Sequence, residues 1–136
     1  MSSALVDALM ELAVQPTEQE IRVFNRAVQR SRELGLQFSP GEVEVRWYCK
    51  YRDRPAFIGL TYDQRPVLVW IESALSPEEA FRTACHELQH AHDLIHLPAY
   101  RTMTRVERER RAEAFAARAC EAEYGRRGTR GVRCLP

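Results

Sequence analysis

The sequence predicts a single domain of the α+β class, in which helices pack against a small sheet. Apolar residues recur with helical spacing towards both ends of the chain. Three short segments between residues 43 and 71 are rich in the β-branched and aromatic residues typical of strands. The chain has 136 residues, of which 45% are hydrophobic and 29% charged, as expected for one soluble domain with one core.

Two helices are expected before the sheet. Residues 3–14 carry an apolar stripe with helical periodicity, and Pro16 ends it. A second helix begins directly afterwards, because Thr17 and Glu20 have the spacing of a capping box. Gly35 stands where that helix would stop. Both helices are interpreted as packing elements.

Three strands are expected next. In residues 42–47 apolar side chains alternate with charged ones, which is typical of a strand with one face in water. Residues 57–62 and 66–71 form two more apolar runs, separated by a turn sequence. We predict a small, three-stranded, mainly antiparallel sheet. The third strand leads into the next helix, so its edge is expected to border a cleft there and could hold an extended peptide.

The helix after the third strand carries the chemistry. Residues 76–79 combine a capping box with proline at the first helical position, and Pro98 marks the latest end of this helix. In the middle of this helix lies the motif HExxH, which consists of His86, Glu87, two further residues and His90. Residues four apart share one face of a helix, so the two imidazoles can converge on one metal ion. Zinc suits such nitrogen ligands, but a catalytic zinc needs a third protein ligand.

One more helix is expected after the HExxH helix. Thr104 and Glu107 form its capping box, and Gly125 is placed to close it. We therefore assign residues 1–124 to the single domain. Residues 125–136 are rich in glycine and arginine and are predicted to be a flexible basic tail.

The residues leave two candidates for the third ligand. Glu109 shares a helix face with Ala112 and other small residues, which would let the last helix approach the HExxH helix closely. The rival is His96, because the chain also satisfies HExxHxxDxxH, close to a longer metal-binding motif. In that motif glycine stands at the position of Asp93, where the chain must leave the helix. We favour Glu109, with His96 as the alternative.

The order of these motifs resembles a known family. The strand, the capped HExxH helix and the run E-R-R-A-E-A-F-A at 109–116 are similar to the ImmA/IrrE-like gluzincin metallopeptidases, whose second helix carries ExxA(N/D/E)xFA. The resemblance covers about residues 40–124, and a weaker one exists to SprT-like proteases. It implies a zincin-like fold. It also implies zinc held by His86, His90 and Glu109, with Glu87 as catalytic base and Glu113 as an outer partner of a ligand histidine.

We therefore predict a zinc-dependent metallopeptidase that hydrolyses peptide bonds through a zinc-activated water, with Glu87 as general base. A selective protein or peptide substrate is expected rather than broad digestion. The reaction also needs a donor to the developing oxyanion. The residues near enough in sequence to be candidates are His92, His96, Tyr100 and Arg101.

Two other functions fit the same residues. The domain could be a non-catalytic zincin-like protein with a binding or regulatory role, or HExxH could have arisen by chance in a helical protein. A net charge of +1 gives no reason to expect nucleic acid, apart from the basic tail. Four cysteines without CxxC spacing and the lack of a signal peptide or a long apolar run predict a cytoplasmic protein without membrane contact. The residues do not indicate an oligomeric state.

Overall fold

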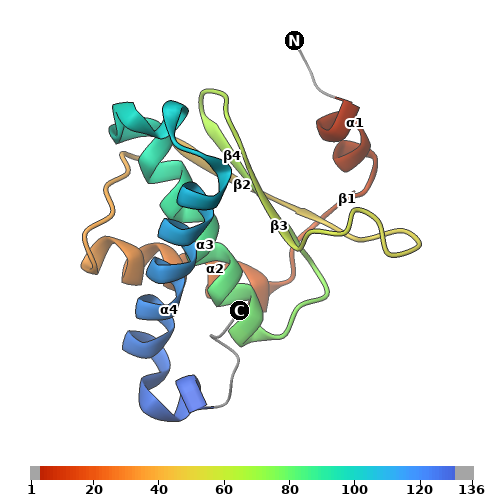
Figure 1. Cartoon of the computed structure of the whole chain (residues 1–136). Helices are drawn as coiled ribbons and strands as arrows, with labels where there is room; N and C mark the ends of the chain where they lie inside the picture. The colour runs from red at the N-terminus through yellow and green to blue at the C-terminus, as the bar shows by residue number, and fades with distance from the viewer. Residues whose placement is uncertain (1–3, 131–136) are drawn as a thin grey trace.

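The computed structural model describes the backbone of residues 4–130 and the side chains of residues 4–125. It has the predicted α+β composition, with helices on both sides of one sheet (Figure 1). The elements in chain order are α1 (Ala4–Glu11), β1 (Ala13–Val14), α2 (Glu18–Glu33), β2 (Val43–Tyr48), β3 (Gly59–Tyr62), β4 (Val67–Glu72), α3 (Pro77–His96), the 3-10 helix η1 (Pro98–Thr102) and α4 (Arg105–Arg130).

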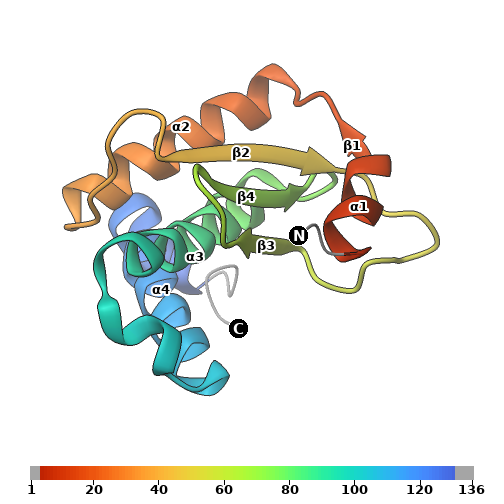
Figure 2. The ribbon, with the colours of Figure 1, turned by 90° about the horizontal axis from the view of Figure 1, so that it is seen from above.

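The sheet differs from the prediction in strand number and direction. It has four strands in the order β1-β2-β4-β3, and β2 runs parallel to β4 while the other pairs are antiparallel. The prediction of three mainly antiparallel strands was therefore wrong. The additional strand β1 has only two residues, Ala13 and Val14, which pair with the end of β2. Figure 2 shows β2, β4 and β3 side by side, with β3 at the edge.

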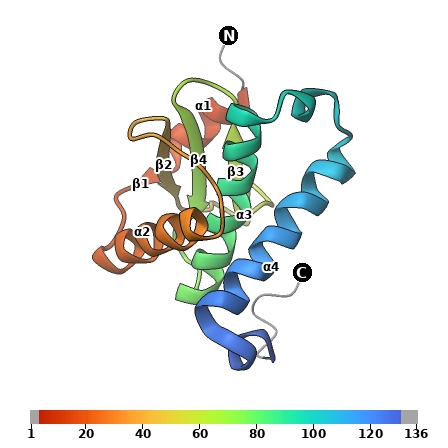
Figure 3. The same ribbon diagram turned by 90° about the vertical axis from the view of Figure 1, so that its left-hand side faces the viewer.

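The two faces of the sheet are covered by different helices. In β4, Val67, Val69 and Ile71 belong to the main core with α2, α3 and α4. Leu68 and Trp70 alternate with them and pack on the other face. There α1 contributes a fully buried leucine at position 9. Central β4 is thus buried on both faces, and α3 lies between α2 and α4 (Figure 3).

The helix starts follow the sequence closely. All three predicted capping boxes are present, at Thr17 and Glu20, at Ser76 and Glu79, and at Thr104 and Glu107. The first helix was expected over residues 3–14 but ends at Glu11. The reason is tertiary, because residues 13 and 14 leave the helix to pair with β2.

The last helix extends further than predicted. Gly125 interrupts it with φ 71° and ψ −165°, a conformation that favours glycine, but a helical segment continues to Arg130. Residues 131–136 of the predicted basic tail lie outside the described residues. Among the described helices, none combines the length and apolar character needed to cross a membrane.

Candidate metal centre

The centre is built where α3 and α4 pack together. The spacing of HExxH places His86 and His90 on one face of α3, with ring centroids 4.9 Å apart. On the facing side of α4, Ala112 and Ala116 are fully buried. These small side chains allow a close approach of the two helices, which brings Glu109 to both histidines.

The three predicted ligands converge through their donor atoms. Glu109 Oε1 lies 3.0 Å from His86 Nε2, and Glu109 Oε2 lies 3.0 Å from His90 Nε2. The three ligand atoms of this group lie within 4.8 Å of one another. Ligands of a tetrahedral zinc with bonds of about 2.0–2.1 Å are roughly 3.3 Å apart. The group could therefore hold a metal ion.

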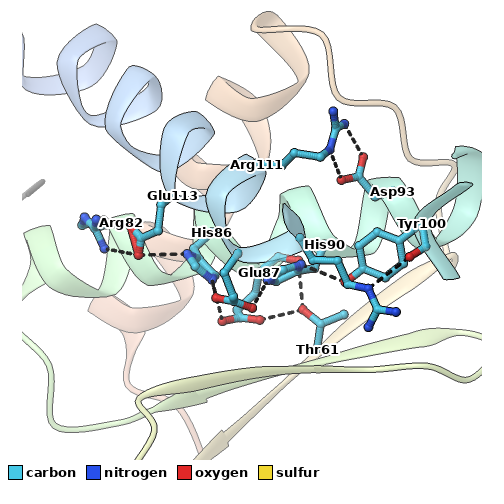
Figure 4. A network of polar contacts seen from close by, with 11 residues as sticks. Thr61, Arg82, His86, Glu87, His90, Asp93, Tyr100, Arg111 and Glu113 are labelled. Atoms are coloured by element: carbon cyan, nitrogen blue, oxygen red, sulfur yellow. Dashed lines mark hydrogen bonds and ion pairs between the residues drawn. The ribbon is translucent and has the colours of Figure 1, made fainter. Parts of the chain in front are cut away.

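Each ligand histidine has a partner for its second ring nitrogen (Figure 4). His86 Nδ1 lies 3.3 Å from Glu113 Oε2, and Glu113 in turn forms an ion pair with Arg82. His90 Nδ1 lies 2.9 Å from the Tyr100 hydroxyl. Burial raises the pKa of Tyr100 to about 12, so the phenol stays protonated at neutral pH. Such partners fix the orientation of ligand rings.

The candidate base Glu87 is buried beside these ligands and is held by a residue of the sheet. The hydroxyl of Thr61 donates to Glu87 Oε1 at 2.7 Å, and it also lies 3.0 Å from the backbone oxygen of Glu87. Burial raises the pKa of Glu87 to about 8; the Thr61 hydrogen bond opposes the rise, and the charges of Glu109 and Glu113 add to it. A cation among the ligands would lower this pKa again. A carboxyl that titrates near neutrality can both take and return a proton.

The contact between Thr61 and Glu87 depends on a glycine two residues earlier. A Cβ atom at Gly59 would lie 2.6 Å from Thr83 Cγ2 and 2.9 Å from Glu87 Oε2, which real contacts do not allow. Glycine therefore lets edge strand β3 lie directly against α3. Residues two apart on a strand share a face, so Thr61 points at the same helix.

These residues line a cleft of about 620 Å³ bounded by β3, α3, η1 and the first turns of α4. Residues 56–60 form a largely apolar wall of the cleft, and Arg105, Arg108 and Glu109 line it on the α4 side. The volume is in the range usual for ligand sites. A smaller cavity of about 400 Å³ between β1, β2 and α2 contains none of the groups described above.

His96, the alternative third ligand, lies elsewhere. It follows His90 by six residues, which turns it about 120° around the helix. Its Nε2 lies 3.0 Å from the backbone oxygen of Gln37, and His92 Nδ1 accepts from the amide of Gln37 at 3.0 Å. The helix also continues through Asp93, which pairs with Arg111 instead of ending the helix as glycine does in the longer motif.

Of the four residues considered as oxyanion donors, only Tyr100 lines the cleft. His92 and His96 bind the segment after α2, and Arg101 forms an ion pair with Asp63 in the turn between β3 and β4. Tyr100 is itself the partner of His90. Tyr100 is therefore placed to orient His90 within the group that could hold a metal ion.

Sequence reasoning missed four residues of the site. Arg82 stands four residues before His86, so helical periodicity could have placed it on the same face. Thr61 comes from a strand, and its contact with Glu87 has no local signature in the sequence. Arg105 and Arg108 line the cleft, but they stand in a run of charged residues that does not single them out.

The chain matches no protein-family model, no curated protein and no solved structure. The resemblance to ImmA/IrrE-like metallopeptidases thus stays a prediction from the HExxH sequence and the run at 109–116. The geometry adds a group of two histidines and one glutamate that could hold a metal ion, next to a buried carboxyl in a cleft.

Proposed function

We propose that this protein is a zinc-dependent metallopeptidase that cleaves peptide bonds in a selected protein substrate. The observation that supports this most is the convergence of His86 Nε2, His90 Nε2 and the Glu109 carboxylate beside Glu87 in an open cleft. Two histidines and one carboxylate are the ligand set of a known class of catalytic zinc sites, with a fourth position for water or substrate. The motif resemblance to gluzincins supports the same function.

In this proposal, His86, His90 and Glu109 would hold the ion, which would supply Lewis acidity for the scissile carbonyl and for water at neutral pH. Glu87 takes the proton of the attacking water and returns it to the leaving amine. Thr61 holds Oε1 of Glu87, so that Oε2 is the oxygen that exchanges the proton. Once Glu87 is protonated, the Thr61 hydroxyl can turn to the Glu87 backbone oxygen 3.0 Å away.

The metal site is tested by the zinc content of protein purified without added metal. We expect about one zinc per chain in the wild type, little in Glu109→Ala and an unchanged amount in His96→Ala, because His96 contacts Gln37 and not the ligand group. Loss of zinc in His96→Ala with retention in Glu109→Ala would reject this ligand set.

The catalytic role is tested by Glu87→Gln, which keeps the size of the side chain and removes its basicity. We expect this variant to retain zinc and to lose hydrolysis of unfolded protein substrates, since Glu87 is not among the ligands. Full activity in the variant would reject Glu87 as the base. A zinc-loaded wild type without turnover on any substrate would favour a non-catalytic binding or regulatory protein.

A further inference from the structure

We propose that the cleft selects peptides that carry a carboxylate close to the scissile bond, and that Arg105 and Arg108 bind this carboxylate. The proposal rests on the peptidase function above and adds a substrate class to it. It is drawn from the contacts that hold Arg108, from the exposed charge of Arg105 and from the charges of the other residues that line the cleft.

Arg108 is held in a fixed orientation at the cleft wall. Its Nε donates to the backbone oxygen of Tyr100 at 3.0 Å, and its NH2 group donates to the backbone oxygen of Arg101 at 3.3 Å. The guanidinium also lies over the Tyr100 ring, 4.9 Å from its centroid. Within the described part of the chain, its NH1 group has no hydrogen-bond partner. A guanidinium held in this way is well suited to bind a carboxylate oxygen.

Arg105 adds a second positive charge on the same side. It precedes Arg108 by three residues, so both lie on one face of α4, and both line the cleft. Arg105 is exposed, and among residues 4–125 its side chain forms neither an ion pair nor a hydrogen bond. Its side chain can therefore move to meet a ligand without breaking a contact within the protein.

Among residues 4–125, the carboxylates of the cleft form no ion pair with these two arginines. All three that line it, Glu87, Glu109 and Glu113, contact other residues of the centre. A divalent ion at the histidines would add further positive charge. The three arginines that line the cleft equal its three carboxylates in number, so the ion would make the cleft net positive, while residues 56–60 are largely apolar. A cleft with one sign of charge attracts ligands of the other sign.

The carboxylate can come from two sources, an acidic side chain or the C-terminus of the peptide. Three fluorescent alanine-based peptides of equal length separate them: one with glutamate side chains and an amidated C-terminus, one with glutamine instead and a free C-terminus, and one with glutamine and an amidated C-terminus. Binding is measured by fluorescence anisotropy to zinc-loaded Glu87→Gln protein, so that cleavage does not interfere.

We expect at least one of the carboxylate peptides to bind about tenfold more tightly than the neutral peptide, the effect of one good charge-assisted contact. Arg105→Gln and Arg108→Gln should each reduce that preference several-fold and leave binding of the neutral peptide unchanged. Arg110→Gln is the matched control, because Arg110 is an exposed arginine of α4 that does not line the cleft.

Equal binding of all three peptides, or a preference that survives both cleft substitutions, would overturn the proposal. If Arg108→Gln disturbs Tyr100 and lowers the zinc content, Arg105→Gln decides, since within residues 4–125 the Arg105 side chain has no hydrogen bond or ion pair to lose. Hydrolysis by the wild type is measured separately. If the protein prefers carboxylate peptides but cleaves none, the peptidase function is rejected and the proposed carboxylate-binding site stands. If it cleaves peptides without this preference, only the proposed substrate class is rejected.

Discussion

At the scale of single residues, the proposed base and its partner come from different elements. Glu87 lies in the middle of α3, and Thr61 reaches it from β3 with an oxygen to oxygen distance of 2.7 Å. The same hydroxyl lies near the backbone oxygen of Glu87, so Thr61 has a partner for its hydrogen whether or not Glu87 is protonated.

This arrangement predicts that Thr61→Val lowers the rate of hydrolysis by about tenfold, since a charge-assisted hydrogen bond to the base is lost. Zinc content should not change, because Thr61 is not among the ligands. Thr61→Ser retains the hydroxyl and serves as the control, with most of the activity expected to remain. Equal rates for the valine and serine variants would show that Thr61 does not act through Glu87.

At the scale of elements, the distance between β3 and α3 is set by Gly59. Gly59→Ala should cost about 1–3 kcal/mol of stability, measured by urea unfolding, because the new methyl group would overlap Thr83 Cγ2. The double variant Gly59→Ala with Thr83→Ser removes that atom and should recover part of the loss. An alanine variant as stable as the wild type would contradict this account of the contact.

The packing of α4 on α2 involves a charged cluster with a predictable pH dependence. Glu123 pairs with Arg26 at 2.8 Å and with Arg30 at 3.2 Å. Burial raises the pKa of Glu123, but the hydrogen bonds and charges of the two arginines lower it more, so the net shift is downward. The stabilisation is therefore present above the usual glutamate pKa of about 4.3 and is lost as the pH falls through the lower folded value.

We expect Glu123→Gln to destabilise the protein by about 1 kcal/mol at pH 7 and much less near pH 3, measured by urea unfolding at both values. Glu121→Gln, an exposed neighbour on the same helix, is the control and should have little effect. A difference between wild type and Glu123→Gln that stays constant down to pH 3 would disprove the linkage.

The elements also show which parts of a fold can be predicted from the sequence. The starts of α2, α3 and α4 follow from local capping boxes, and they were predicted correctly. The order of the strands depends on which edges meet in space, and alternation along each strand contains no such information. For this reason the parallel pairing of β2 with β4 was missed. The fourth strand was missed because the two residues of β1 are too few to show any alternation.

At the scale of the whole molecule, the candidate ion would join two helices that otherwise meet through side-chain packing. His86 and His90 belong to α3 and Glu109 to α4, while both helices also share the buried core. We therefore expect the metal-free protein to remain folded but to unfold at a lower temperature, since an ion that binds only the folded state stabilises it.

At free zinc about 100 times the dissociation constant this stabilisation amounts to about 2.7 kcal/mol. It is measured by thermal unfolding with chelator and after zinc is added back. Glu109→Ala is the control and should respond little to zinc, because it lacks one of the three ligands. Identical melting of the chelated and zinc-loaded wild type would argue against a site that binds zinc tightly.

The site as a whole was predictable only where its residues lie on helices. The spacing of His86, Glu87 and His90 is local, and the face shared by Glu109 and Glu113 follows from helical periodicity once the second helix is known. Which side chain would complete the ligand group required the packing of α3 on α4. Helical periodicity places His96 on another side of α3 from His86 and His90, where it contacts Gln37.

The position of these residues along the chain has a consequence for how the site would assemble during folding. The candidate ligands and their outer partners all lie in one continuous stretch, residues 82–113, whereas the support for Glu87 arrives from residues 59–61. The two kinds of contact nevertheless span similar lengths of chain, 26 residues between Thr61 and Glu87 and 23 between His86 and Glu109. Loop length therefore favours neither of them, and we expect the metal group and the support of the base to form in the same folding step.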